Sequence, residues 1–381
     1  MSNQLEIVTI PTAVDIHDHL RWPSPVNLSE DFESGTKSAA LSGFGLLCDM
    51  PNTQGRPTWS WEEVEFKHNG VKEQAWVPMA FHAGSQLDSE AQPTNLDELE
   101  AMSKGTIGLK LYFGLTTGNE SVKDINVWDY EPIVKRWHEV APDKPILVHR
   151  GNADLEEIIA MVAIRYEHPL HVCHVNNPDE VRVVKVAKDH ELPVTCGVTP
   201  HHLFKTSHEV MTSGWNKRMQ PPLARQDDAE ELWRMLVNGD IDIVETDHAP
   251  HPPENKRRAE VLNPHGHETS EPGATCYGVS GIEETMPQLL YQERLGRISL
   301  DRLVEVTSTK PAEIIGVRLG RHTKVSYLRE LGQVQNPTSI YHGNMIGGRV
   351  LRSVIRNTLV VDDGKLVERM GLVISERGDE I

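Results

Sequence analysis

Eight short apolar segments recur along this chain of 381 residues, and each of them ends in polar or charged residues. Helix-like stretches separate most of the segments, so the pattern predicts an α/β protein with a parallel sheet. Eight strand–helix units close a (β/α)8 barrel, or TIM barrel, and this is the fold that we expect. An open doubly wound sheet is the alternative, but the sequence lacks the glycine-rich phosphate loop that follows an early strand in such folds. The predicted strands cover residues 13–21, 44–52, 76–84, 107–113, 145–150, 170–175, 193–202 and 241–251.

Residues that favour helix ends support the intervening helices. Ser29 precedes an acidic first turn and is predicted to be the N-cap of a helix over residues 30–43. Pro178 opens a second predicted helix. A third begins near Asp227 and is predicted to end at Gly239, because glycine readily adopts the left-handed conformation that ends many helices.

The pattern changes after about residue 317. Residues 354–361 and 365–367 flank an Asp-Asp-Gly turn, which predicts a β-hairpin. Residues 5–10 are also strand-like, so both chain termini are expected to form a small β appendage. The predicted division is a barrel domain over residues 12–317 and a reduced, β-sandwich-like appendage over residues 1–11 and 318–381.

Charge and cysteine content exclude several classes of protein. Lys and Arg total 38 and Asp and Glu total 56, so the net charge of −18 disfavours a nucleic-acid partner. The four cysteines form no CxxC pair, which argues against a disulfide framework or a thiolate zinc finger. No apolar run approaches the ~18–20 residues that span a bilayer. The N-terminus does not resemble a signal peptide, so we expect a cytoplasmic protein with no membrane partner.

Histidine is abundant, with 19 residues, and several of these lie at strand ends. Asp15, His17, His19 and Arg21 are spaced by two at the first strand, so their side chains are expected to share one face. Two imidazoles at this spacing can bind one metal ion, although a single pair can equally be incidental. Further candidate ligands end the fifth, sixth and eighth strands, and the strand ends of a TIM barrel meet at one mouth. These further ligands are His149, His174 and Asp247, whose donor atoms suit zinc.

Lys110 ends the fourth strand and leaves two interpretations open. A lysine that loses its proton and adds CO2 becomes a carbamate, an anion whose two oxygens can bridge two metal ions. The alternative is an ion pair between the Lys110 ammonium and Asp247. The residue types alone do not separate the two.

Eight motifs occur in the order found in dihydroorotases of the amidohydrolase superfamily: DIHDHLR, CDMPNT, GLKLY, LVH, HVCHV, VTPHHL, PPL and TDHAPH. The resemblance extends from about residue 12 to 317 and is similar to the class I branch, which includes the dihydroorotase domain of multifunctional pyrimidine enzymes. It implies reversible interconversion of N-carbamoyl-L-aspartate and L-dihydroorotate in pyrimidine biosynthesis. It also makes a homodimer, and association with aspartate transcarbamoylase, reasonable expectations.

The resemblance implies a site with two zinc ions. The first ion would be held by His17, His19, carboxylated Lys110 and Asp247. The second would share the carbamate and add His149 and His174. A hydroxide would bridge the ions, because paired metals lower the pKa of bound water. Asp247 would act as the general base and acid.

Substrate contacts follow from the same resemblance. The planar fork of Arg21 matches a carboxylate, which dihydroorotate carries and dihydropyrimidine, hydantoin and allantoin lack. Arg21, Asn52 and His251 match the carboxylate-binding residues of dihydroorotases, although Arg21 could also be a surface residue beyond its strand. The remaining expected contacts are Gln220, Ser280 and Gly281, with Thr116 and Thr117 in a loop that covers the substrate.

Three positions depart from the family pattern. Arg150 and Gly197 stand where relatives often have an alanine and a glutamate, and Gln220 stands where an asparagine or arginine is frequent. None of the three is a predicted metal ligand, so they bear on substrate fit more than on metal binding.

Several other residues are expected to have structural roles. Cys173 should point away from the face of His174 and pack in the core. His201 and His202 are interpreted as structural rather than as metal ligands. Residues 252–280 are predicted to form a long loop, in which Lys256 and its basic neighbours are solvated and His265, His267 and Glu268 hold no metal.

Two other functions compete with dihydroorotase. Another cyclic amidase, such as a hydantoinase, dihydropyrimidinase or allantoinase, would use the same metal ligands, but Arg21 and Asn52 argue against it. An inactive homologue that serves as a scaffold is the second rival, and such proteins typically lose metal ligands that this chain keeps.

Overall fold

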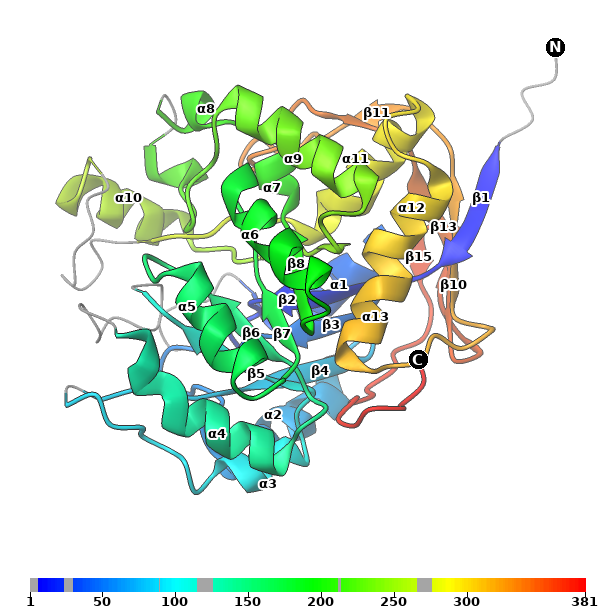
Figure 1. Cartoon of the computed structure of the whole chain (residues 1–381). Coiled ribbons are helices and arrows are strands. Elements are labelled where there is room, and N and C mark those ends of the chain that lie inside the picture. Colours follow the sequence, from blue (N-terminus) through cyan, green and yellow to red (C-terminus); the bar gives the residue numbers. More distant parts are fainter. Residues whose placement is uncertain (1–5, 24–29, 89, 115–125, 212–213, 266–275) are drawn as a thin grey trace, which may run out of the picture.

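Eight parallel strands, β2 to β9, form the central sheet of the computed structural model in strict chain order (Figure 1). The structure describes residues 6–23, 30–88, 90–114, 126–211, 214–265 and 276–381. All eight predicted strands are confirmed, although each is shorter than predicted. The strands are β2 (Ala13–Asp18), β3 (Phe44–Asp49), β4 (Met79–Gly84), β5 (Gly108–Tyr112), β6 (Ile146–His149), β7 (Leu170–Val172), β8 (Val194–Val198) and β9 (Ile243–Val244).

The sheet closes where its first and last strands meet. A parallel bridge joins Asp18 to His248, and the His19 amide donates to the His248 carbonyl at 2.8 Å. The Asp15 carboxylate also accepts from the Thr246 amide at 3.1 Å. These bonds join β2 to the segment that follows β9, and the predicted TIM barrel is confirmed.

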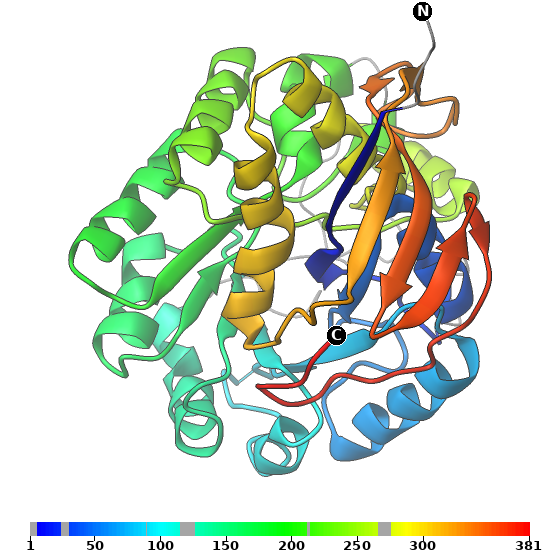
Figure 2. The same cartoon turned by 90° about the vertical axis from the view of Figure 1, so that its right-hand side faces the viewer.

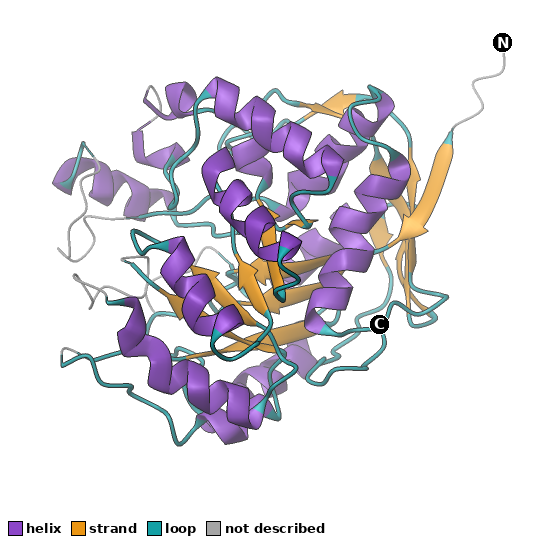
Figure 3. Cartoon of the chain, in the orientation of Figure 1, coloured by secondary structure: helices purple, strands orange, loops and turns teal. Residues whose placement is uncertain are grey.

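Helices surround the strands (Figure 3). Asp31 is the N-cap of α1, because its side chain accepts from the Ser34 amide and forms a capping box, so the helix begins later than predicted; Ser29 lies outside the described residues. The predicted helix end at Gly239 is confirmed, with a φ of 93°. The helices are α1 (Phe32–Ser42), α2 (Trp61–Gln74), α3 (Leu99–Ser103), α4 (Glu131–Val140), α5 (Leu155–Ile159), α6 (Pro178–Asp189), α7 (Pro200–Phe204), α8 (Ser207–Met211), α9 (Gln226–Asn238), α10 (Pro253–Leu262), α11 (Ile282–Arg294), α12 (Leu300–Val304) and α13 (Lys310–Ile315). Short turns of other helix types are η1 (Val127–Tyr130), η2 (Ala160–Ile164), η3 (Gly214–Lys217) and η4 (Glu305–Thr309). No helix in these described ranges is long and apolar enough to cross a membrane.

Apolar side chains fill the barrel as well as the layer between strands and helices. Leu46, Ala80, Leu147 and Ile243 belong to one buried cluster, although they come from β3, β4, β6 and β9. Strands that are not neighbours in a closed sheet can share a cluster only across its interior. The barrel is therefore a packed core whose polar residues gather toward one end.

A second, antiparallel sheet is built from both ends of the chain in the order β1-β10-β13-β14-β15 (Figure 2). Residues 354–361 were expected to form one strand, and this was wrong. Arg356 and Asn357 form a turn there, with φ values of 50° and 69°. The predicted hairpin around Gly364 is confirmed, whereas the division into domains stays a prediction. The remaining strands are β1 (Ile7–Pro11), β10 (Lys324–Leu328), β11 (Gly332–Gln333), β12 (Met345–Ile346), β13 (Arg349–Ile355), β14 (Thr358–Asp362) and β15 (Lys365–Leu366).

The predicted loop over residues 252–280 begins with a helix, α10. Lys256 in this helix is buried, which corrects the expectation that it is solvated. Its ammonium donates to the carbonyls of Cys276 at 2.8 Å and Gly278 at 2.7 Å, and burial lowers its pKa to about 8. Lys256 therefore fixes the end of the insertion to its beginning. His267 and Glu268 lie outside the described residues.

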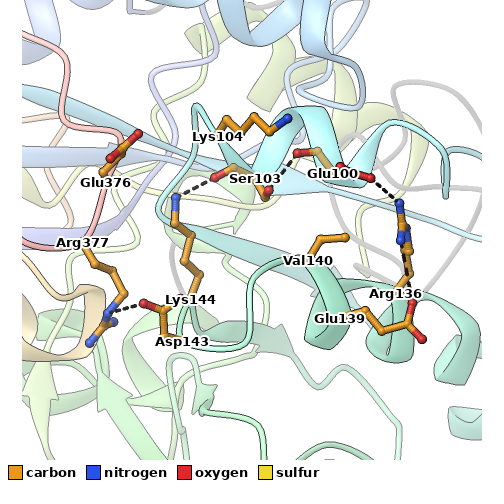
Figure 4. Close-up of a pocket in the computed structure, with 10 residues that line it drawn as sticks. All are labelled: Glu100, Ser103, Lys104, Arg136, Glu139, Val140, Asp143, Lys144, Glu376 and Arg377. Atoms are coloured by element: carbon orange, nitrogen blue, oxygen red, sulfur yellow. Dashed lines mark hydrogen bonds and ion pairs between the residues drawn. The ribbon is translucent and has the colours of Figure 1, made fainter.

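A surface pocket of about 650 Å³ lies at the amino-terminal ends of β5 and β6 (Figure 4). Lys144 lines it and donates to the carbonyls of Ser103 and Thr106 at 2.6 Å and of Ser375 at 3.0 Å. These bonds tie the C-terminal segment to the barrel. The pocket is at the end of the barrel opposite the carboxyl ends of the strands, where residues of TIM barrels usually serve stability.

The buried His168 makes the stability of the fold depend on pH. Burial lowers the pKa of His168 from 6.5 to about 4, and the hydrogen bond from its Nε2 to the Lys144 carbonyl offsets only part of this shift. The unfolded chain therefore binds a proton that the folded chain excludes as pH falls from about 6.5 to about 4. Over this window the folded state should lose about 1.4 kcal/mol per pH unit from this residue. Urea titrations at several pH values should show a shallower decline for His168→Gln, and parallel declines in both proteins would contradict the prediction.

Candidate metal centre

His17, His19 and Asp247 meet at the carboxyl end of the barrel. His17 lies in β2, His19 directly follows β2, and Asp247 follows β9. The Nε2 atoms of His17 and His19 lie 3.4 Å and 3.1 Å from Asp247 Oδ1. All three side chains are buried, and one donor atom from each lies within 4.8 Å of the others. This spacing allows the three side chains to hold one metal ion.

His149 and His174 bring a second pair of imidazoles to the same place. His149 Nδ1 lies 2.9 Å from His174 Nε2, and the ring centroids of His17 and His174 are 5.2 Å apart. His149 Nε2 is buried without a hydrogen-bond partner in the described part of the chain. A buried polar atom without a partner is costly, and a bound metal ion would satisfy it.

Lys110 is fully buried in β5, and its ammonium donates to Cys173 Sγ at 3.0 Å. The alternative ion pair between Lys110 and Asp247 does not form. Cys173 was expected to face away from His174, and this was wrong. The regular part of β7 ends at Val172, and His174 has a φ of 40°, so the strand alternation does not continue. Cys173 is nevertheless buried, as expected. Burial raises the pKa of its thiol to about 12, although the nearby charge of Lys110 acts to lower that pKa.

Glu245 is a site residue that the sequence analysis missed. Its carboxylate is fully buried and accepts from His17 Nδ1 at 3.0 Å and from the His174 amide at 2.5 Å. The sequence signal was available, because Glu245 lies two residues before Asp247 within the predicted strand over residues 241–251, where this spacing would place both on one face. His17, Cys173 and Glu245 form a second group of donors within 4.8 Å of one another.

Burial sets the protonation of the centre. It lowers the pKa of His19 to about 4 and of His149 to about 3, and it holds the pKa of His174 well below its ordinary value. Burial alone would raise the pKa of Asp247, but the neighbouring His17 and His19 outweigh it and lower that pKa. Neutral imidazoles and an ionised carboxylate are the forms that bind metal. The residues therefore fit a metal centre in both geometry and charge.

Arg21 lies beside this cluster and is buried, so it is not a surface residue. Its Nη1 donates to the Pro250 carbonyl at 3.2 Å, and its Nε has no partner among the described residues. Burial lowers the pKa of His251, and the nearby charge of Arg21 lowers it further. His251 Nε2 donates to the Tyr277 carbonyl at 2.7 Å. Asn52 Oδ1 accepts from His19 Nδ1 at 2.8 Å. The predicted carboxylate-binding residues thus adjoin the candidate metal ligands.

Three residues of the centre have left-handed backbone conformations at strand ends. The φ values are 53° for Arg21, 40° for His174 and 45° for Asp247. Such conformations are costly for residues other than glycine, and they concentrate at functional sites. For His174 this conformation breaks the alternation of β7, and its ring lies beside those of His149 and His17.

The other expected contacts have mixed outcomes. Thr116 and Thr117 lie outside the described residues, and Gln220 and Ser280 are half-buried in loops. The Gly281 amide lies at the start of α11 and donates to His248 Nδ1 at 3.1 Å.

The neighbouring histidines differ in their surroundings. His202 contacts Thr199 Oγ1 at 2.7 Å, which suits the structural role expected of it. His201 is buried with no partner for either ring nitrogen within the described ranges.

Two of the departures from the family pattern have a structural account. Arg150 Nε donates to Glu180 Oε1 at 2.8 Å, so its charge is paired with α6. Gly197 lies against the Glu245 carboxylate, so close that it leaves no room for a side chain. For Gln220 the structure provides no explanation.

The fold and the site together define a TIM-barrel protein with a candidate metal centre at the carboxyl ends of its strands. The sequence pattern of the amidohydrolase family matches residues 8–324, and the chain belongs to this family. Dihydroorotase from Staphylococcus epidermidis is 32% identical over 340 residues, which cover 83% of this chain and 76% of that enzyme. Multifunctional protein CAD from Squalus acanthias is 29% identical over 378 residues, or 95% of this chain. The chain spans 15% of the length of that relative.

Solved structures share the fold. Dihydropyrimidinase from Brevibacillus agri superposes with a TM-score of 0.81 at 20% identity, over 98% of this chain and 89% of that one. The inactive dihydroorotase-like domain of the Chaetomium thermophilum CAD-like multifunctional protein gives 0.73 at 18% identity, over 97% and 98%. At these identities the likeness concerns architecture alone.

Proposed function

We propose that this chain is a dihydroorotase that interconverts L-dihydroorotate and N-carbamoyl-L-aspartate in pyrimidine biosynthesis. The observation that carries the proposal is the buried Arg21 beside the His17, His19 and Asp247 cluster, because a buried guanidinium calls for an anionic partner. The similarity to dihydroorotases agrees with it. Location in the cytoplasm, a homodimer and association with aspartate transcarbamoylase remain predictions.

Two zinc ions are the proposed cofactors. His17, His19, Asp247 and carboxylated Lys110 would hold one ion, and His149 and His174 would hold the other with the shared carbamate. When bound, the ions would acidify and orient the water that attacks the ring amide carbon. The neutral imidazoles and the unpartnered His149 Nε2 support this assignment.

Asp247 is proposed to move the proton. In ring opening, its carboxylate takes a proton from the attacking water and delivers it to the ring nitrogen as the carbon–nitrogen bond breaks. In ring closure, it takes a proton from the carbamoyl nitrogen while water leaves. The lowered pKa of Asp247 keeps the carboxylate ionised, which is the form that a general base requires before the reaction.

The direct test is steady-state ring opening of L-dihydroorotate by the zinc-loaded protein, with dihydrouracil and allantoin assayed alongside. We expect turnover of dihydroorotate alone. Turnover of an uncharged ring would retain the metal chemistry and overturn the substrate. No turnover with zinc present would favour an inactive homologue, as would a purified protein that neither contains metal nor gains activity with zinc.

Replacing Arg21 should separate substrate choice from chemistry. An Arg21→Lys variant keeps a cation but loses the bidentate fork, so kcat/KM for dihydroorotate should fall by about 10- to 100-fold, mainly through KM. Metal content should remain that of the parent protein, because Arg21 is not a proposed ligand. An unchanged KM for dihydroorotate would contradict the role of Arg21 in binding the carboxylate.

A further inference from the structure

The buried carboxylate of Glu245 connects three parts of the centre. Oε2 accepts from His17 Nδ1 at 3.0 Å and lies 3.5 Å from His171 Nε2. Oε1 accepts from the His174 amide at 2.5 Å. The carboxylate therefore joins β9 to β2 and to the end of β7, and its ionic partners among the described residues are histidines, not lysine or arginine.

The bond to His17 defines which ring nitrogen carries the proton. A carboxylate only accepts, so His17 Nδ1 must donate to it. His17 Nε2, which lies 3.4 Å from Asp247 Oδ1, is then left as the nitrogen with a free lone pair. A histidine that binds metal through one nitrogen is usually held through the other by an acceptor of this kind.

Gly197 on β8 provides the room for this carboxylate. A Cβ atom built on Gly197 would lie 2.5 Å from Glu245 Oε1 and 2.7 Å from its Cδ. The φ of Gly197 is not in the left-handed region, so the backbone does not require glycine there. The requirement is steric: any side chain at position 197 points directly at the volume that the Glu245 carboxylate fills.

We propose that Glu245 is the positioning residue for His17, and that Gly197 and Glu245 are an interdependent pair in which one carboxylate can be supplied from either strand. A glutamate at position 197 would project into the volume that Glu245 now fills. This inference rests on the proposed metal-dependent function. It adds a residue that holds the centre without contacting substrate.

Metal affinity, measured by competition with a chelator, tests the pair independently of turnover. Glu245→Gln and Glu245→Ala should each weaken zinc binding by about 10- to 100-fold, while the number of ions bound at saturation stays unchanged. The double variant Gly197→Glu with Glu245→Ala should recover most of the lost affinity. The control is the double variant Gly197→Ala with Glu245→Ala. It places a side chain at position 197 without a carboxylate, so it should not recover the lost zinc affinity.

The visible spectrum of the cobalt-substituted protein supplies a second readout. It should change in Glu245→Gln and return toward that of the parent protein in the glutamate-swapped double variant. Asp242→Asn is the matched control, because Asp242 directly precedes the same strand and pairs with Lys188 at 2.5 Å. Its zinc affinity and cobalt spectrum should be those of the parent protein.

Three results would overturn the proposal. The first is parental metal affinity in Glu245→Gln and Glu245→Ala. The second is equal recovery of zinc affinity by alanine and by glutamate at position 197 in the Glu245→Ala background, which would show that the two positions interact only through packing. The third is loss of a whole ion at saturation, which would make Glu245 a ligand. A parent protein that binds zinc but does not open dihydroorotate would refute the proposed function and leave this test intact.

Discussion

An Asp247→Asn variant is expected to lose about 10²- to 10⁴-fold in kcat for ring opening of dihydroorotate. Asparagine keeps the size of the side chain and an oxygen that can face His17 and His19, which lie 3.4 Å and 3.1 Å from Asp247 Oδ1. It cannot take up a proton from water or return one to the ring nitrogen. The loss should therefore persist when zinc is saturating, and the pH dependence of kcat that this carboxylate causes should disappear.

Zinc content must be measured on the same samples, because Asp247 is also a proposed ligand. Full zinc occupancy with lost turnover would isolate the proton-transfer role, whereas lost zinc would assign the defect to binding. Asp242→Asn is again a suitable control and should keep kcat. A kcat within about tenfold of the parent protein in Asp247→Asn would rule out its role as general base.

A Lys110→Ala variant is expected to lose most of its bound zinc, with affinity weakened by on the order of 100-fold or more, and to lose turnover with it. Lys110 is fully buried, with its ammonium against Cys173, and it is the proposed source of the anion shared by both ions. Removing it leaves neutral imidazoles and one carboxylate to balance four positive charges. Metal analysis after dialysis measures the loss.

Lys144→Met is the control for removal of a buried lysine. Lys144 lies at the opposite end of the barrel and donates to three carbonyls, so its loss should lower the free energy of unfolding without changing zinc content. Parental zinc content in Lys110→Ala would exclude a bridging role for Lys110.

Much of the fold was predictable because the strand pattern depends on local features. Each strand is a short buried run, and helix signals such as Gly239 act within one turn. The convergence of the candidate ligands followed from topology, because eight parallel strands place their carboxyl ends together. The Arg356–Asn357 turn was not predicted because Asn357 is the only turn-forming residue in it, and Arg356 is an unusual residue for the left-handed conformation that it adopts.

The details of the centre were less predictable, since they depend on three-dimensional contacts. Alternation along β7 fails at His174, whose left-handed conformation brings it to the interior, which Cys173 also faces. Lys256 is basic and lies in a polar segment, yet its ammonium is buried and donates to two carbonyls that lie 20 and 22 residues further along the chain. The spacing of Glu245 from Asp247 is readable in the sequence, but the room that Gly197 leaves for its carboxylate depends on a contact between segments far apart in the chain.

The closure of the barrel between Asp18 and His248 has a consequence for how the protein acquires activity. His17 and Asp247 flank that junction, although 230 positions separate them in the chain (247 − 17). The donor atoms cannot assemble until the last strand docks against the first, so a nascent or partly folded chain should have no competent site. Zinc uptake during refolding would thus report the final docking step. Zinc added before that step would find no complete set of donor atoms to bind it.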